Sequence, residues 1–150
     1  MESVSDVKAR LKELFDTQRL AVLATQEGSQ PYTSLMSFAA TEDLKHIVFV
    51  TSQSTRKYAN LGKNSQVALL IDSRTNRESD IREAIAVTAI GKACEVKLDE
   101  KESLIDLYRT KHPHLDEFLM SPSQVLIKVT VQSYVVVSKF QKVREFVPTL

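Results

Sequence analysis

Six side chains that suit phosphate binding lie close together in the chain. Four hydroxyl groups come just before an arginine and a lysine, in the order Thr51, Ser52, Ser54, Thr55, Arg56 and Lys57. An apolar, strand-like run precedes them, and a short helix is expected from Arg56 onward. A helix N-terminus presents unpaired N–H groups and the positive end of a dipole, and hydroxyl donors and cations beside it would complete a phosphate-binding site. A capped surface helix with two solvated charges has the same local sequence, so this pattern alone leaves both interpretations open.

The composition of the chain predicts one domain, residues 1–150, with a single core. Of its 150 residues 43% are hydrophobic, which is sufficient for one substantial core. Lysine and arginine number 20 and the acidic residues 19, giving a formal net charge of +1. A nucleic-acid-binding domain usually carries a basic excess on one face, so we expect no nucleic-acid partner.

Several features of the sequence predict a cytoplasmic protein. The one cysteine, Cys94, cannot form an internal disulfide, which is usual in a reducing compartment. The N-terminal segment is charged and lacks the apolar block of a signal peptide. No run approaches the ~20 apolar residues of a membrane-spanning helix, and we expect no membrane association.

Apolar and β-branched runs separated by polar turns predict seven strands. They cover residues 20–25, 32–40, 46–51, 66–72, 84–96, 125–131 and 134–140. Gly91 predicts a bulge or bend within its strand. Gln132 and Ser133 are expected to turn the last two strands into a hairpin.

Helices are expected at the start of the chain, after the third strand and late in the sequence. Ser5 is a candidate cap for the first helix and Asp99 for a helix over residues 100–110, with a short helix over residues 115–120 to follow. Strands in mostly hairpin order with flanking helices predict a mainly β fold, a closed or split antiparallel barrel of about six or seven strands. The absence of alternating βαβ units argues against a doubly wound sheet.

Three segments of the chain together resemble one protein family. Residues 20–25 are similar to its first barrel strand, Gln30-Pro31-Tyr32 to the opening of its second, and residues 48–57, VFVTSQSTRK, to the end of its third. In that family the last segment has the form V-F-Y-T-N-x-x-S-R-K, which this chain matches at positions 51, 56 and 57. The chain thus resembles the pyridoxamine-phosphate oxidase-like flavoproteins, whose fold is an FMN-binding split barrel.

The resemblance implies FMN as the cofactor and eight residues that bind it: Ser34, Leu35, Met36, Ser37, Thr51, Ser52, Arg56 and Lys57. Arg56 and Lys57 would hold the FMN phosphate, which an arginine fork and a lysine charge at a helix start suit well. Thr51 and Ser52 would donate to the same group. Residues 34–37 would run along the isoalloxazine edge, with Leu35 and Met36 as its apolar surface. An ordinary strand with alternating environments would have these residues without any ligand.

The chain departs from the pattern of the true oxidases at positions that bind the flavin and at positions that bind the substrate. Their second strand carries an arginine for the flavin phosphate and a lysine for the substrate, and the following strand carries a glutamine for the flavin. The corresponding residues here are Ser34, approximately Ala39, and Ala86. The C-terminal Arg-x-His motif is missing and the chain has no tryptophan, so we do not expect oxidation of pyridoxamine phosphate. Three residues of a polar loop are candidates to replace the lost cation: Arg74, Arg77 and Arg82.

Two other groups of residues are weaker candidates. His112 and His114 bring two imidazoles together, but with no cysteine nearby and no helical histidine spacing, a solvated helix end is favoured over a metal site. Tyr134 and Phe140 are interpreted as barrel lining rather than as flavin contacts. No side chain is expected to act as a catalytic nucleophile or general base.

The function implied by the resemblance is that of an FMN-dependent oxidoreductase, which moves hydride or electrons to or from an unassigned small molecule. The family places its flavin between two protomers, so we expect a homodimer. The alternatives are a flavin- or haem-binding protein without turnover and a deazaflavin-dependent reductase. Haem-degrading relatives depend on a C-terminal extension with a histidine, which this sequence lacks, so FMN is favoured.

Overall fold

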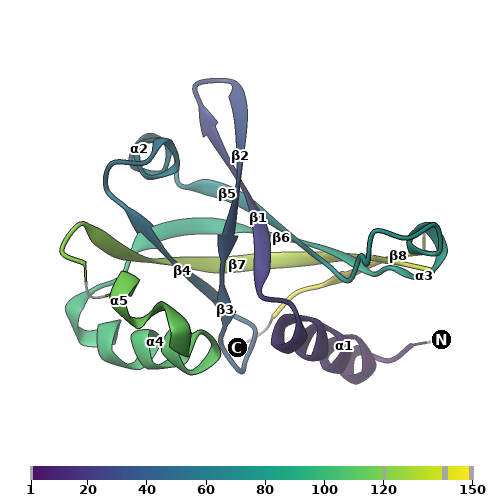
Figure 1. Cartoon of the computed structure of the whole chain (residues 1–150). Helices are drawn as coiled ribbons and strands as arrows, with labels where there is room; N and C mark the ends of the chain where they lie inside the picture. The colour runs from purple at the N-terminus through teal and green to yellow at the C-terminus, as the bar shows by residue number, and fades with distance from the viewer. Residues whose placement is uncertain (1, 120, 140–141, 149–150) are drawn as a thin grey trace.

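A bent antiparallel sheet of eight strands forms most of the molecule (Figure 1). The computed structural model describes residues 2–119, 121–139 and 142–148. Of residues 117 and 118 it describes the backbone alone. The strands are β1 (Leu20–Glu27), β2 (Gln30–Ser37), β3 (Ala39–Ala40), β4 (His46–Ser52), β5 (Gln66–Asp72), β6 (Ala86–Glu95), β7 (Gln124–Ser138) and β8 (Lys142–Phe146). They are ordered β2-β1-β5-β6-β7-β4-β3, with β8 paired to β7 outside this path. Edge strand β2 also contacts β4, so the sheet curls into the split barrel that the sequence predicts.

The described helices lie around the ends and outer faces of this sheet. They are α1 (Val4–Thr17), α2 (Arg56–Lys63), α3 (Asp80–Glu83), α4 (Leu98–Lys111) and α5 (Asp116–Leu119), with a 3-10 turn, η1 (Pro113–Leu115), before α5. Figure 1 shows α2 beside the β1–β2 hairpin and α4 and α5 together near β4. In the described part of the chain, no helix has the length and apolar character needed to cross a membrane.

Strand β4 separates two hydrophobic cores, which explains why its sequence is almost continuously apolar. Ile47 and Phe49 belong to the main core inside the barrel. Val48 and Val50 point the opposite way, into a second core that includes Tyr108 of α4. The outer side chains of β4 therefore share a compartment with α4.

The C-terminal strands differ from the predicted hairpin of residues 125–131 and 134–140. Strand β7 runs through both segments without a break and pairs with β4, β6 and β8. On β6, Ile90 pairs with Ser133, and the next residue, Gly91, pairs with Val131. Gln132 is therefore the extra residue of a β-bulge, so an irregularity does occur opposite Gly91 as predicted, but its extra residue lies on β7 and not on β6. Gln132 and Ser133 also lack the Gly or Asn that a tight hairpin turn requires.

Two helix starts also differ from the prediction. Ser3, not Ser5, caps α1: its hydroxyl accepts from the Asp6 N–H, and the Asp6 carboxylate accepts from the Ser3 N–H. This reciprocal capping box needs an acceptor side chain three residues after the cap. Three residues after Ser5 the chain has Lys8, which cannot accept a hydrogen bond. Helix α4 begins at Leu98, one residue before the predicted cap Asp99. The predicted elements also included two residues that lie outside the described ones, Met120 and Phe140.

Gly91 is required where β6 meets the bulge of β7, and replacing it should destabilise the fold. A Cβ atom at this position would overlap the backbone oxygen of Thr130, which the sheet holds in place. Gly91→Ala should lower the free energy of unfolding by roughly 1–3 kcal/mol, the usual cost of overpacking, as measured by urea denaturation. Gly62→Ala is the matched control, because nothing lies within 4 Å of its Cβ position. A loss at Gly62 as large as that at Gly91 would contradict this explanation.

Candidate functional site

The turn between β4 and α2 is built around the hydroxyl of Thr55, which caps the helix. Thr55 Oγ1 accepts from the Tyr58 N–H at 3.3 Å and donates to the carbonyl oxygen of Ser52 at 2.8 Å. The hydroxyl oxygens of Ser52 and Ser54 lie 3.0 Å apart on the exposed side of the turn. The N–H groups that precede Tyr58 in the first turn have no intrahelical partner, so the helix start retains donors for an anion.

Thr51 supports this cap from beneath. Its side chain is 1% exposed, and its Oγ1 lies 3.0 Å from Thr55 Oγ1. Because the Thr55 proton is directed to the Ser52 carbonyl, Thr51 is the donor of this pair. The Thr51 hydroxyl is thus engaged within the protein, whereas Ser52 is only half-buried.

The two cations of the turn have different surroundings beside β2. Arg56 is exposed, and its guanidinium carbon lies 5.0 Å from the centre of the Tyr32 ring, a cation–π contact. Lys57 is half-buried, and burial lowers the pKa of its ammonium group. A cation in such a poorly hydrated position gains from a neighbouring anion.

A hollow of about 230 Å³ lies beside Lys57 and is lined by four of the eight predicted residues. The lining residues are Leu35, Met36, Ser37, Val50, Lys57, Tyr108 and Leu115. They come from β2, β4, the start of α2, α4 and η1, so the fold gathers segments that are far apart in the sequence. The other predicted residues lie next to it in the chain: Ser34 on β2, and Thr51, Ser52 and Arg56 at the capped turn.

Ser34 adds a buried hydroxyl whose hydrogen-bonding capacity is unused. Among the described residues its Oγ has no hydrogen-bond partner, and Gln124 Oε1, opposite Ser52 on β7, has the same property. Leaving a buried polar atom unpaired costs about 1–3 kcal/mol, so such atoms often mark the place of a bound molecule. The hydroxyls, the cations and the apolar wall together fit a ligand with an aromatic ring and a phosphate.

Comparison with known protein families identifies the family of this chain. The family model for pyridoxamine 5'-phosphate oxidase matches residues 7–137, a range that includes every residue of the hollow and of the capped turn. The chain belongs to the pyridoxamine 5'-phosphate oxidase family. No curated protein matches it significantly.

Solved structures from several bacteria have the same fold as this family member. A heme binding protein from Mycobacterium smegmatis has a TM-score of 0.84 at 13% identity, covering 99% of this chain and 59% of that one. General Stress Protein 26 from Bacillus anthracis has a TM-score of 0.69 at 17% identity, covering 93% and 98%. An FAD-binding protein from Mesorhizobium loti has a TM-score of 0.68 at 14% identity, covering 85% and 91%. At these identities the likeness establishes the split-barrel fold alone, and this chain spans less than two thirds of the Mycobacterium protein.

The polar loop after β5 does not bring its arginines to the hollow. Arg74 pairs with Asp72 at 2.9 Å. The Asp80 carboxylate accepts backbone N–H groups from residues 75, 76 and 77, and these bonds, that of residue 75 first, lower the pKa of Asp80. The loop is therefore organised by its own capping, and Lys57 is the one cation among the lining residues.

Three lining residues were not predicted from the sequence, namely Val50, Tyr108 and Leu115, and Tyr108 is the one with a polar group. It is 1% exposed, burial raises the pKa of its phenol, and its ring centre lies 4.9 Å from that of His112. The available signal was spacing, since Tyr108 follows the apolar Leu104 by four positions on the same face of α4. Nothing local in the sequence indicates that this face meets β2.

The end of α4 is buried, contrary to the predicted solvated end at His112. His112 is 1% exposed, and its Nε2 donates to the Phe38 carbonyl oxygen at 2.8 Å. Lys111 Nζ donates to the Phe15 carbonyl oxygen at 2.6 Å and lies 3.6 Å from the centre of the Phe38 ring. The contacts with Phe38 fix the residue that directly follows Ser37 of the hollow. In the described part of the chain, no group of three His, Cys, Asp or Glu residues gathers as metal ligands would.

His112 should make the protein less stable as the pH falls. Burial lowers its pKa below the ordinary 6.5, so the unfolded chain binds the proton more tightly than the folded one. The free energy of unfolding should therefore decrease as the pH drops below 6.5. His112→Gln keeps a donor toward Phe38 but does not titrate. It should lose less stability between about pH 7.5 and pH 5, as measured by urea unfolding at both values.

Burial also lowers the pKa of His46, so the pH dependence of His112→Gln should be reduced but not abolished. A variant whose stability falls as steeply as that of the wild type would contradict the assignment to His112.

Proposed function

We propose that the chain binds FMN and acts as an FMN-dependent oxidoreductase on a small molecule. The observation that carries this proposal is the hollow that joins residues 35–37 of β2 to Lys57 at the start of α2. An apolar wall with a few polar groups suits a flat ring with a polar rim, and the cationic end suits a phosphate. Membership of the pyridoxamine 5'-phosphate oxidase family supports the same cofactor.

The phosphate would be held at the capped turn. Arg56, Lys57, the Ser52 hydroxyl and the N–H groups of the first helical turn offer it charge and donors from one side. A bound dianion would offset the burial that lowers the pKa of Lys57. Thr51, whose proton goes to Thr55, would act indirectly by keeping the cap in place.

The ring would lie against residues 35–37, with Tyr108 opposite. Ser34 lies next to this wall in the chain but does not line the hollow, so its Oγ, which has no partner among the described residues, is not assigned to the ring. When bound, the flavin supplies hydride and electron transfer. The residues of the chain would bind it, orient it and exclude water, so the proposal requires no nucleophile or general base from the protein.

A second candidate function is haem binding, favoured by the likeness to the heme binding protein of Mycobacterium smegmatis. FMN is preferred because His112, whose ring packs against Tyr108 of the hollow, uses its Nε2 on the Phe38 carbonyl. Titration of the purified protein with FMN, a deazaflavin and haem, followed by absorption, separates these candidates. Bleaching of the bound flavin by NAD(P)H would then distinguish an enzyme from a flavin carrier.

We also propose a homodimer with the flavin at the protomer interface. The hollow of about 230 Å³ is smaller than the roughly 300–1,000 Å³ of most small-molecule sites. Leu35 lines it and also lines a second hollow of about 290 Å³ over β1 and β5. The proposed site thus opens onto the outer face of the sheet, where a second copy would complete it.

The outer face of the sheet carries a mostly apolar row that crosses five paired strands. The row consists of Leu35, Val22, Leu70, Thr88 and Val135. Leu35 is 65% exposed and Leu70 37%, and exposed apolar surface of this kind commonly marks an interface. A second copy of the chain on this face would bury the row and close the hollow in one step.

Arg56→Ala combined with Lys57→Ala should weaken FMN binding by at least roughly tenfold, since each charged contact to phosphate is worth about 1.5–3 kcal/mol. Quenching of flavin fluorescence measures the affinity. Arg77→Ala with Arg82→Ala is the matched control, because it removes the same charge from a loop outside the hollow. Equal affinity of the first double variant and the wild type would overturn the site.

Leu70→Glu should convert the dimer to monomers, because a carboxylate buried without a partner at the interface costs several kcal/mol. Analytical ultracentrifugation measures the mass of the assembly. FMN affinity should fall when the dimer is lost, because the proposed site needs both copies. Leu98→Glu is the control, since Leu98 is 88% exposed at the start of α4. A wild-type monomer, or a Leu70→Glu dimer as tight as the wild type, would refute the proposed interface.

A further inference from the structure

We infer that Asn60 and Thr25 are positioning residues, which place helix α2 so that its N-terminus can hold a phosphate. The inference rests on the proposed function, and it goes further by naming what fixes the phosphate-binding helix. Neither residue lines the hollow beside Lys57, and neither belongs to the capped turn.

The polar contact between these residues is buried and directional. Asn60 Nδ2 donates to Thr25 Oγ1 at 3.0 Å, and the two side chains are 2% and 1% exposed. Asn60 is the one buried residue of α2. Tyr58 and Leu61 of α2 also pack against the main core, but both are only partly buried. A helix is usually fixed by a buried apolar face, so in α2 the partner of the fully buried amide takes a larger share of that role.

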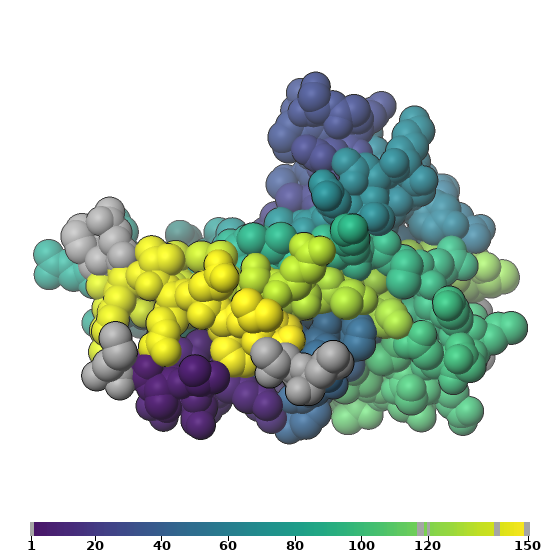
Figure 2. Space-filling model, turned by 180° about the vertical axis from the view of Figure 1, so that it is seen from behind, coloured from purple at the N-terminus to yellow at the C-terminus, as the bar shows by residue number. Residues whose placement is uncertain are grey.

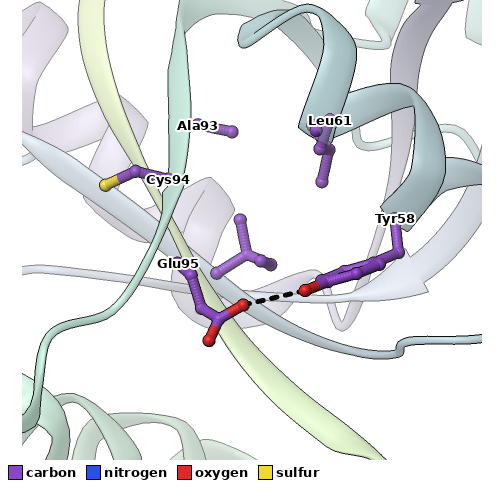
Figure 3. A pocket seen from close by; sticks show the side chains of 7 residues that line it. Tyr58, Leu61, Ala93, Cys94 and Glu95 are labelled. Carbon is purple, nitrogen blue, oxygen red and sulfur yellow. Dashed lines mark hydrogen bonds between the residues drawn. The ribbon is translucent and has the colours of Figure 1, made fainter.

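The packing beneath α2 is loose, which increases the importance of this hydrogen bond. Figure 3 shows the hollow between α2 and the sheet, with Leu61 on the helix side and Ala93 on β6. Its volume is about 150 Å³. At its rim the Tyr58 hydroxyl donates to Glu95 Oε1 at 3.0 Å, an exposed bond. Apolar contacts on this side leave free space, so they define the place of the helix less strictly than the buried amide does.

The β1–β2 hairpin holds α2 at three points along its length. Besides the central bond to Thr25, Asn64 Nδ2 donates to Gln26 Oε1 at 2.9 Å beyond its C-terminus. At its N-terminus, the Arg56 guanidinium lies over the Tyr32 ring. Figures 1 and 2 show the hairpin and α2 projecting together from the body of the molecule. Helix and hairpin therefore form one unit, in which the Asn60–Thr25 bond is the buried central contact.

A shift of α2 would move its N-terminal charges away from the wall of the hollow. Lys57 belongs to the helix, whereas residues 35–37 and Tyr108 belong to β2 and α4. Ligand contacts depend on geometry at the level of about 0.5 Å. Losing the central bond should therefore reduce phosphate binding while leaving the ring end of the hollow unchanged.

The test compares Thr25→Val, which keeps the shape but removes the acceptor, with Thr25→Ser, which keeps the hydroxyl. Affinities are measured for FMN and for riboflavin, which differ only in the phosphate. Thr25→Val should lose roughly tenfold in FMN affinity, about the effect of one unpaired buried group, with riboflavin affinity unchanged. Thr25→Ser should bind both flavins like the wild type. Hydrogen exchange should also show faster opening of α2 in Thr25→Val without ligand.

The outcomes separate this inference from the proposed function. Thr25→Val could bind FMN as tightly as the wild type while the double variant Arg56→Ala with Lys57→Ala binds it more weakly. That result would overturn the inference and retain the site. Equal losses for FMN and riboflavin would indicate general destabilisation and would also overturn it. A wild type that binds FMN no better than riboflavin would instead refute the phosphate site itself, and the inference with it.

Discussion

The capping hydroxyl of Thr55 is the interaction on which the rest of the candidate site depends. It ends β4 through the Ser52 carbonyl, starts α2 through the Tyr58 N–H, and accepts the proton of the buried Thr51. An N-cap contributes only about 1 kcal/mol, but its effect here is geometric. It determines where the open N–H groups of the helix and the two following cations lie relative to β2.

The cap can act in this way because the strand that precedes it, β4, is held by packing on both of its faces. Strand β4 is packed on both faces, with Phe49 in the main core and Val50 in the core shared with α4. Side chains alternate between the faces of a strand, so Thr51 points inward to support the cap. Val50 lines the hollow, and Ser52 shares its face. One strand register thus places Thr51 under the cap and turns Val50 and Ser52 toward the candidate site.

The capped turn could be predicted from the sequence because its parts are neighbours in the chain. Capping acts over three residues, and the helix start at Arg56 is confirmed. Tyr108 and the Asn60–Thr25 bond could not be predicted, because each depends on segments that meet only in the folded barrel. Gln132 shows the same limit: a polar residue between apolar runs fits a turn as well as a bulge, and only its partner strand decides between them.

The two ends of the hollow are therefore held by different parts of the fold. The end proposed to bind phosphate consists of short-range structure, the capped turn and the helix tied to β1. The wall formed by Tyr108 and Leu115 rests on the second core, outside the barrel. Substitutions in that wall can change the shape of the ring end without disturbing the main core or the start of α2. Of the positions where this chain departs from the oxidases, only the one near Ala39 corresponds to a substrate contact, whereas Ser34 and Ala86 correspond to flavin contacts. The resemblance therefore implies that this chain would hold a flavin with a different set of side chains, and not only that its substrate differs.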